Sequence, residues 1–491
     1  MTMRKGNLRL SKSGNVAREL VYANSLDAYV PELWANESIL VLQENMVAAN
    51  MVHRDFENQI ANFGDVVNTR KPAGFTAKRK LNDDDVTVQD ATATNIQVPL
   101  NQHIHTSFMI RDGEESKSFK QLVVEYLTPA VQSLARMLDQ IVLGQVYQFL
   151  ANAEGAIGLL TDSTVKGYIV DTRKRMNINK AYEDNRNLIW TPNSEASALK
   201  LDWFMNAEKV GDNGTALREA SLGRKFQFNN FMCQNTSSVS NGLVVAAATR
   251  AIAVDLAAGY PVGATTVHMD GTGGRLIEVG DFFKFDSEGI PHQVTATANL
   301  STDDVDVTFT PALKRAVLQD ATTSWYATGL VNQATGSPTG YAAGWSKEIV
   351  MDGLTGAIEP GTMIRFATDG TPNVNLAGTY CVVQVTNNSG NTIGITLDRP
   401  LAVAVLNNDV ICIGPEGDYN FAFHKNALAL VCRPLAQAPA GLALSSVQSA
   451  NGASVRVTMT YNGLKQGTLV TVDLLCGIAT LDTDLGAVLL G

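Results

Sequence analysis

The sequence predicts an α+β protein that combines one long helix, strands from both halves of the chain and a repeated all-β insertion. Apolar residues recur every three or four positions from Ser118 to Asn152, which is typical of one face of an α-helix. Apolar and polar residues alternate over 96–110 and 420–432, which is typical of half-buried strands. From about residue 240 to residue 413 the chain is rich in Gly, Thr, Val and Ala and has no helical period, which indicates an inserted β region.

The long helix is predicted to be divided at Pro129. Proline lacks the N–H group that an inner turn donates, but it fits the first helical position. Thr128 is therefore predicted to be the N-cap and Pro129 the first residue of the longer part. From Pro129 to Asn152 that helix would span roughly 36 Å at 1.5 Å per residue. It is long enough to serve as the spine of an extended protein.

Two elements are predicted before the spine. Pro31 opens a helical pattern carried by Leu33, Leu40, Val47 and Met51. Residues 70–112 contain a polar, charged excursion followed by an alternating strand, and predict a long two-stranded loop that projects from the body. An isolated hairpin is marginally stable in water, so this loop is expected to lie on another subunit.

A mixed α/β region is predicted after the spine, and strands are predicted again near the C-terminus. The pattern predicts a helix over Val165–Asn179, a strand that enters a helix near Pro192, and a strand over Phe226–Cys233. Asn462-Gly463 lies between two alternating runs and predicts a hairpin.

The β region contains an internal repeat, in which residues 267–296 are echoed by 349–370. Met269-Asp270-Gly271 matches Met351-Asp352-Gly353, Phe282–Phe285 matches Met363–Phe366, and 294–317 matches 382–405. Each copy has short runs of strand type separated by Asp-Gly, Gly-Asp and Asn turns, as in small barrels or sandwiches. We predict a duplicated insertion with units over 241–345 and 346–413, linked by the charge-free stretch 336–344.

Charge is distributed unevenly along the chain, whose net charge is −10. Residues 254–413 hold 16 acidic and 7 basic residues, a net charge of −9. The N-terminal arm is basic, and it could meet an acidic partner or nucleic acid, or be a solvated tail. Its basic residues before the first acid are Arg4, Lys5, Arg9, Lys12 and Arg18. The sequence has no long uncharged apolar run and no apolar core of a secretory signal, so a soluble protein without a membrane partner is expected.

Motifs of catalysis are absent from the sequence. It has no phosphate loop, no GxGxxG after a strand, no HExxH and no GxSxG. The five cysteines are widely spaced and form no CxxC, so buried free thiols are favoured over disulfides or a metal site. They are Cys233, Cys381, Cys412, Cys432 and Cys476. We therefore predict no enzyme, no catalytic residues and no cofactor.

Three polar clusters could carry a site, and each has a simpler interpretation. His103 and His105 share one side of a strand, where they are either metal ligands or, as we favour, exposed polar residues. Asp83-Asp84-Asp85 lacks the spacing of a calcium loop, and a solvated loop tip or a salt-bridge partner is favoured. Arg173-Lys174-Arg175 is favoured as a solvated helix surface over a contact with nucleic acid. No metal site is predicted.

Three segments together resemble the major capsid (coat) proteins of tailed bacteriophages with the Hong Kong 97-type fold. They are residues 31–72, residues 420–436 and the closing strand–turn–strand that contains VDLLCGIATL (472–481). The sequence is most similar to the coat proteins of short-tailed Salmonella phages, which carry an inserted β domain. The resemblance covers about half of the chain. Members of that subgroup have one inserted domain, whereas the repeat here predicts two units.

The resemblance implies a division of the chain into arm, loop, spine and core. The implied segments are an N-terminal arm (1–60), an extended loop (61–115), a spine helix of the peripheral domain (116–155), and an axial and peripheral core (156–240 and 414–491). Subunits of such shells need hinge freedom, and the glycines at 64, 74, 155 and 158 are candidates. Some relatives form covalent cross-links, but no motif assigns such a pair here.

The function implied by the resemblance is structural. Many copies would form pentamers and hexamers of an icosahedral head shell that encloses double-stranded DNA, assembled in the bacterial cytoplasm around a scaffolding protein and then expanded. A portal protein and a decoration protein are further implied partners, and the virion is the implied location. The alternative is a cell-surface or tail adhesin whose β units bind glycan. An enzyme with an unrecognised site is the third hypothesis.

Overall fold

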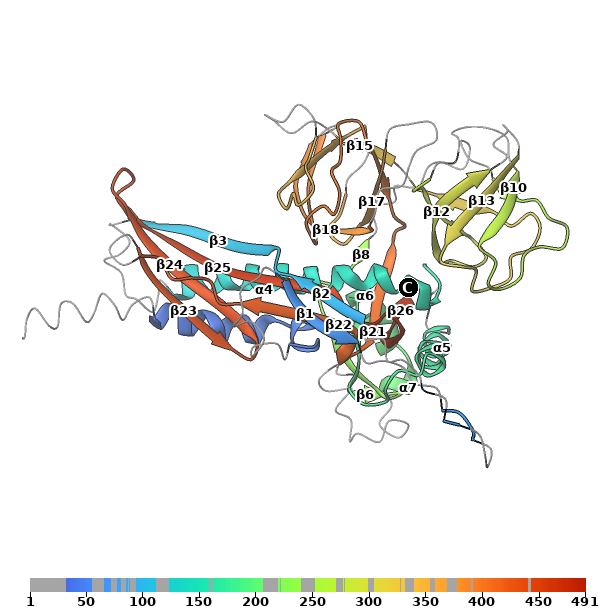
Figure 1. Ribbon diagram of the computed structural model, residues 1–491, viewed down its shortest axis with the longest axis horizontal. Coiled ribbons are helices and arrows are strands. Elements are labelled where there is room, and N and C mark those ends of the chain that lie inside the picture. The colour runs from blue at the N-terminus through green and yellow to red at the C-terminus, as the bar shows by residue number, and fades with distance from the viewer. Residues whose placement is uncertain are drawn as a thin grey trace, which may run out of the picture.

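The chain folds as an α+β protein in a computed structural model, with two β units on one side of an elongated body (Figure 1). The structure describes residues 32–54, 66–71, 77–80, 85–86, 88, 94–111, 123–158, 160–161, 163–205, 220, 222–239, 252–270, 277, 279–298, 304–326, 328–331, 340–353, 358–368, 378–389, 392–439 and 443–491. The predicted basic arm, at residues 1–31, lies outside them.

One end of the body is a seven-stranded sheet covered by helices. Its path runs β4 (Ala153–Gly155), β26 (Gly486–Leu490), β21 (Gly417–His424), β5 (Arg186–Trp190), β7 (Phe228–Met232) and β6 (Arg224–Lys225), and β8 (Ser238–Val239) pairs with β21. Helix α5 (Val165–Ile178) buries Val165, Ile169 and Met176 against this sheet. The predicted helix over 165–179 and strand over 226–233 are confirmed within two residues.

The strand-to-helix step at Pro192 is also confirmed. Strand β5 ends at Trp190, the Thr191 side chain accepts a hydrogen bond from Ser194 N, and helix α6 (Pro192–Leu199) begins with proline in its first turn. The short helix α7 (Asp202–Met205) follows. Proline is favourable here because the first N–H groups of a helix have no partner within it.

The other end of the body is a long lobe built on the spine. Its sheet consists of β22 (Leu428–Arg433), β25 (Gly467–Thr480), β24 (Ala453–Asn462) and β23 (Leu444–Ala450), and β3 (Gln102–Arg111) pairs with β25. The predicted hairpin joins β24 to β25, and the register pairs Asn462 with Gly467. Short 3₁₀ turns, η6 (Lys425–Ala427) and η7 (Thr483–Leu485), lie at the strand ends nearest the spine.

The spine differs from the prediction in two ways. A π-helical turn η3 (Val123–Leu127) runs into α4 (Thr128–Leu143), which continues as a 3₁₀ helix η4 (Gly144–Asn152). Thr128 is therefore not an N-cap, because Leu127 before it is already helical and makes no side-chain cap. Pro129 lies in the first turn of α4, directly after the π-helical turn, and the helix continues through it although proline donates no backbone hydrogen bond.

The N-terminal helix over residues 32–45 lies against the spine. Its predicted apolar face was partly wrong, because Leu40 is 55% exposed while Trp34, Ile39 and Leu42 are buried. The 3₁₀ turn η1 (Ala48–Asn50) follows, and Asp139 of α4 accepts hydrogen bonds from Val47 N at 2.9 Å and Ala49 N at 3.0 Å. Burial raises the pKa of Asp139 to about 6.

The predicted two-stranded loop is confirmed only in part, because the alternating run over 96–110 forms two strands rather than one. The first of them pairs within the loop, whereas the second, β3, belongs to the long sheet through its pairing with β25. Strands β1 (Val66–Lys71) and β2 (Thr94–Pro99) are antiparallel, and Val67 and Val98 pack on Ala429 and Val431 of β22. Beyond these strands the described residues of 77–88 are exposed and lie away from the body (thin blue trace, lower right of Figure 1).

The two β units have the same order of strands. The first consists of β9 (Ala253–Val254), β10 (Thr266–Asp270), β11 (Phe282–Phe285), β12 (Pro291–Ala298), β13 (Asp304–Thr310) and β14 (Thr323–Trp325), and the second of β15 (Thr328–Val331), β16 (Ile349–Asp352), β17 (Met363–Ala367), β18 (Tyr380–Ser389), β19 (Thr392–Leu397) and β20 (Val410–Ile413). The first sheet runs β14-β11-β12-β13-β10-β9, and the second closes into a barrel in the matching order β20-β17-β18-β19-β16-β15.

The predicted boundary between the β units is wrong. Strand β15 pairs with β16 and β20, so the second unit begins at Thr328 and not at residue 346. The described part of the predicted link, residues 340–344, therefore lies inside the second unit, where Tyr341 bridges Val405 and is buried. A charge-free stretch rich in glycine is as typical of a tight loop as of a linker, and here Gly340 and Tyr341 lie against Val405 of the barrel.

Candidate functional site: the joints that hold the two β units

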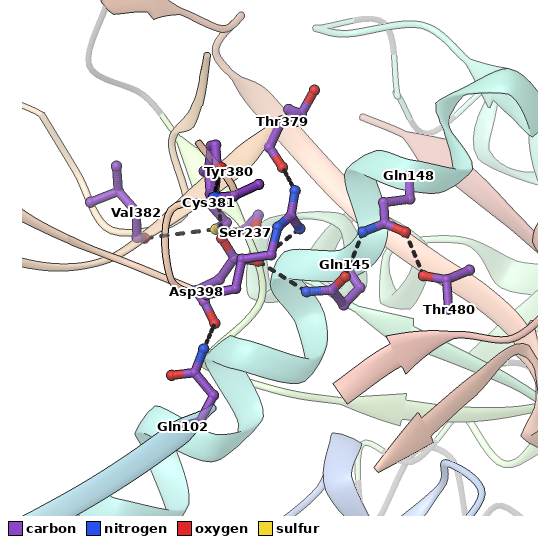
Figure 2. A network of polar contacts seen from close by, with 12 residues as sticks. Gln102, Gln145, Gln148, Ser237, Thr379, Tyr380, Cys381, Val382, Asp398 and Thr480 are labelled. Carbon is purple, nitrogen blue, oxygen red and sulfur yellow. Dashed lines mark hydrogen bonds and ion pairs between the residues drawn. The ribbon is translucent and has the colours of Figure 1, made fainter. Parts of the chain in front are cut away.

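A buried carboxylate holds the second β unit on the spine. Asp398 follows β19 and is fully buried. Its Oδ1 accepts a hydrogen bond from Cys381 N at 2.8 Å, and its Oδ2 accepts one from Gln145 Nε2 of η4 at 2.9 Å (Figure 2). Its backbone carbonyl accepts a hydrogen bond from Gln102 Nε2 of β3 at 3.0 Å. One residue thus connects the barrel, the spine and the long sheet.

Further contacts extend this joint along the spine. Gln145 Oε1 accepts a hydrogen bond from Gln148 Nε2 at 2.6 Å, and Gln148 Oε1 accepts one from Thr480 Oγ1 at 2.6 Å. The Tyr147 hydroxyl donates to Gly361 O of the second unit. A Cβ atom on Gly144 would lie 3.0 Å from the Cβ atoms of both Asp398 and Cys381, so the barrel approaches the helix closely where α4 becomes η4.

The electrostatics of this joint follow from burial. Desolvation raises the pKa of Asp398, and Arg399, whose Nη1 lies 3.3 Å from Oδ2, acts in the opposite direction. Desolvation likewise raises the pKa values of Tyr147 and Cys381. The Tyr147 hydroxyl and the Cys381 thiol therefore stay protonated near neutral pH. The contacts of Asp398 and Tyr147 attach the second unit to the spine.

The first β unit is attached differently, at the edge of the core sheet. Ile157 N donates to Gly289 O at 2.9 Å, and a Cβ atom on Gly289 would lie 2.5 Å from Ala156 Cβ. The guanidinium of Arg315 lies 5.6 Å from the Tyr168 ring of α5. This joint rests on backbone approach and a cation–π contact.

Two ionisable side chains are buried together within the first unit. Glu288 and His292 are fully buried, and Glu288 Oε2 lies 2.7 Å from His292 Nε2. Glu288 Oε1 accepts hydrogen bonds from Lys314 N at 2.5 Å and Arg315 N at 3.2 Å. In the second unit the position of His292 is taken by Tyr380, whose hydroxyl accepts a hydrogen bond from Ala402 N at 2.9 Å.

A polar cleft of about 380 Å³ lies between the first unit and the core sheet. Lys284, Asn193, Ser238 and Asp418 contribute to its wall. Ser238 Oγ donates to Asp418 Oδ1 at 2.5 Å, and Asn193 Nδ2 lies 3.2 Å from Ser238 Oγ, so these groups already satisfy one another. The cleft offers no set of convergent free groups among them.

The histidines singled out from the sequence lie on the long sheet. His103 and His105 are exposed, and their ring centroids are 6.5 Å apart. His103 Nε2 lies 3.1 Å from Asp473 Oδ2, but the same carboxylate binds the guanidinium of Arg456, with Arg456 Nε 3.0 Å from Oδ1. In the part of the chain that the structure describes, no three His, Cys, Asp or Glu side chains form a group that could hold a metal.

The acidic and basic clusters are placed only in part. Asp85 is exposed, while Asp83 and Asp84 lie outside the described residues. On α5, Arg173 Nε donates to Gln227 Oε1 at 3.0 Å and Arg175 Nε lies 3.3 Å from Glu154 Oε1, so two of the three basic residues contact the body. The predicted solvated helix surface therefore holds for the exposed Lys174 but not for Arg173 and Arg175.

All five cysteines are buried and free. Desolvation raises the pKa values of Cys233 and Cys432 to about 12, which keeps both as neutral thiols. Cys432 faces Cys476 across the β22–β25 pair.

Of the four candidate hinge glycines, Gly155 and Gly158 are described. Gly155 is part of β4, which pairs with β26, and a Cβ atom there would lie 2.5 Å from Leu490 O. Its left-handed φ of +90° allows this close packing, which accounts for the glycine without a hinge. Gly158, with φ of +73°, has no atom within 4 Å of a Cβ position. Gly64 and Gly74 lie outside the described residues.

Sequence reasoning missed the joint residues Asp398, Gln145 and Gln102. The available signal was weak: Asp398-Arg399-Pro400 ends a strand, and Gln145 interrupts an otherwise apolar helical face. None of the described helices is both long and apolar enough to cross a membrane.

Comparison with known proteins gives structural similarity alone. No protein-family model and no curated protein matches the chain. A solved structure from Mycobacterium phage Che8 is similar over 90% of each chain, with 10% identity and a TM-score of 0.40. The capsid of cyanophage P-SCSP1u is similar over 90% of this chain and 87% of its own, with 10% identity and a TM-score of 0.41. The capsid of Staphylococcus phage Andhra is similar over 89% of this chain and 84% of its own, with 7% identity and a TM-score of 0.35. TM-scores this low leave the function to be argued from the geometry of this chain.

Proposed function

We propose that this chain is the major capsid protein of a tailed bacteriophage, and that many copies form the icosahedral head shell around double-stranded DNA. The sequence resemblance to coat proteins of the Hong Kong 97-type fold supports this proposal. The protein has a structural role in this proposal, and the buried Asp398 joint holds the second β unit on the spine.

The observation that carries the proposal is the exposure of apolar side chains at the extremities of the molecule. Val86 and Val88, in the projecting loop, are 74% and 87% exposed. Leu464, at the end of the β24–β25 hairpin, is 99% exposed. Single exposed apolar residues are ordinary on a globular surface, but here they lie on the parts that extend furthest from the core. Covering them with neighbouring subunits removes the unfavourable exposure.

The distribution of charge supports an orientation in the shell. Both β units lie on the same side of the spine α4 (Figure 1), and the region 254–413 that contains them carries a net charge of −9. Packaged DNA repels an acidic surface. The β units therefore face outward in this proposal, and the rest of the chain, which is nearly neutral, faces the genome.

We also propose that the β units arose by duplication. Matched contacts recur in both: Tyr260 bridges Val317 as Tyr341 bridges Val405. Gly263 N donates to Leu313 O at 2.7 Å as Gly344 N donates to Leu401 O at 2.7 Å. These contacts agree with the shared strand order and with the repeat in the sequence.

The resemblance extends the proposal to partners and location. Assembly takes place in the bacterial cytoplasm around a scaffolding protein, with a portal protein at one vertex, and is followed by expansion. A decoration protein is a further partner, and contact with DNA is non-specific. The mature location is the virion.

Expression of the full chain, alone and together with a candidate scaffolding protein, tests the proposal. Sedimentation and electron microscopy are expected to show closed shells of megadalton size. A matched variant, Val86→Lys with Val88→Lys, is expected to yield fewer shells, because it places charge where apolar contacts form. A stable monomer or trimer under all these conditions would contradict the proposal and favour the adhesin hypothesis.

A further inference from the structure

Each β unit presents a charge-free apolar patch at the same place in its fold. The first patch is Leu256, Val262 and Leu318, which are 40%, 63% and 72% exposed. The second patch is Leu406, which is 56% exposed, with the exposed Ala342 and Ala343. Leu318 and Leu406 each directly follow the valine that forms the Tyr–Val bridge of their unit.

Both patches are held rigidly by the same device. Gly259 and Gly340 have left-handed φ values of +63° and +102°. A Cβ atom on Gly259 would lie 2.5 Å from Val317 O, and one on Gly340 would lie 2.3 Å from Val405 O. In each unit a glycine therefore lets one loop press against the backbone that carries the exposed leucine. Rigid presentation lowers the entropy that a contact would cost.

Charge distinguishes these patches from the rest of the β units. Residues 256–267 and 401–408 contain no charged side chain, although the region 254–413 holds 16 acids. Asp320 borders the first patch and is exposed, whereas Asp409 beside the second patch is buried and accepts a hydrogen bond from Leu406 N at 2.6 Å. Two acidic bodies repel each other, and this repulsion is smallest when they meet through faces without charge.

We propose that the first patch of one subunit packs against the second patch of a neighbouring copy of this chain, an inference that rests on the proposed shell. Subunits in a closed ring meet through unlike surfaces, so the first patch meets the second rather than itself. The two β units lie next to each other on one side of the body (Figure 1), which places unlike units side by side when copies are arranged in a row. A basic partner is disfavoured, because it would bind the acidic faces instead.

Cysteine cross-linking between copies tests this pairing. Leu318→Cys and Leu406→Cys are prepared as separate full-chain variants, co-assembled into shells and mildly oxidised. A cross-linked dimer is expected in mixed shells and not in shells of either variant alone. The native cysteines give little background because all five are buried.

The outcomes separate this inference from the proposed function. Equal dimer formation in shells of one variant alone, or no cross-link in intact mixed shells, would overturn the pairing while leaving the shell proven. Failure of the wild-type chain to form shells under any condition would overturn the proposed function and this inference with it.

A charge variant gives a second measurement. Leu406→Lys is expected to raise the protein concentration needed for assembly roughly tenfold, which is the effect of losing about one buried leucine contact. Gln384→Lys, at an exposed position on β18 outside the patch, is the matched control and is expected to assemble as the wild type does. Equal effects of the two variants would contradict the inference.

Discussion

The two β units have the same strand order but bury their charged groups in different places. The first unit buries Glu288 and His292 in its own core and attaches to the body through backbone approach at Gly289. The second unit has Tyr380 in the corresponding core position and places a fully buried acid, Asp398, at the joint with the spine. A buried charge is costly unless it is fully hydrogen-bonded. A contact that includes such a charge therefore loses the most stability when one partner is removed. In the first unit this contact is the Glu288–His292 pair inside the unit, and in the second it is the Asp398 joint with the spine.

The largest expected effect is at the second joint. Asp398→Ala removes the carboxylate that accepts hydrogen bonds from Cys381 N and Gln145 Nε2. It is expected to lower the free energy of unfolding of the second unit by about 3 kcal/mol. Asp398→Asn keeps one acceptor oxygen and is expected to cost less. Hydrogen exchange of peptides from 358–413 in the full chain measures both variants. Equal protection of Asp398→Ala and the wild type would show that the joint does not depend on this carboxylate.

A similar loss is expected inside the first unit, with a specific rescue. Glu288→Ala removes the acceptor of Lys314 N and Arg315 N and is expected to cost about 2–3 kcal/mol. Adding His292→Tyr copies the arrangement of the second unit, where the Tyr380 hydroxyl accepts from Ala402 N. The double variant is therefore expected to recover part of the loss in hydrogen exchange of peptides from 279–326. A double variant less stable than Glu288→Ala would contradict the equivalence of the two cores.

The two joint glycines are expected to differ in tolerance. Gly289→Ala places a Cβ atom 2.5 Å from Ala156 Cβ at a φ of +73°, and is expected to cost about 2 kcal/mol. Gly144→Ala meets the Cβ atoms of Asp398 and Cys381 at 3.0 Å with a helical φ of −60°, and is expected to cost about 1 kcal/mol. Thermal unfolding of the two variants gives the order. The reverse order would show that the second joint is the tighter of the two.

The smallest expected effect is a pH dependence confined to the second joint. Burial raises the pKa of Asp398 in the folded state above its ordinary value of 3.8. The folded state therefore binds this proton more tightly, and the stability from Asp398 is greatest at low pH and decreases as pH rises through the folded pKa. Asp398→Asn lacks this dependence. Denaturation at several pH values is expected to show the wild type losing its advantage over Asp398→Asn as pH rises, and a growing advantage would contradict the assignment.

The sequence predicted the elements whose signal is local. The 3.6-residue period located α4 and α5, the Thr191-Pro192 pair located the start of α6, and Asn462-Gly463 located the β24–β25 hairpin. The internal repeat was aligned correctly enough that Met269 and Met351 occupy matching positions in β10 and β16.

Features that depend on packing between distant segments were not predictable. Asp398 contacts Gln145 and Gln102, which are 253 and 296 residues away in sequence, and no spacing indicates such a contact. The boundary at Thr328 was missed because β15 is short and pairs with strands that come much later in the chain. The π turn before Pro129 was missed because the proline rule assumes an ordinary α-helical start.

Hydrogen exchange of peptides that contain Val86 and Val88, compared between dispersed subunits and assembled shells, tests the central claim most directly. If neighbouring copies cover this loop, exchange is fast in dispersed protein and at least about tenfold slower in shells. Equally slow exchange in a dispersed monomer would contradict the account, because the loop would then be covered by its own chain.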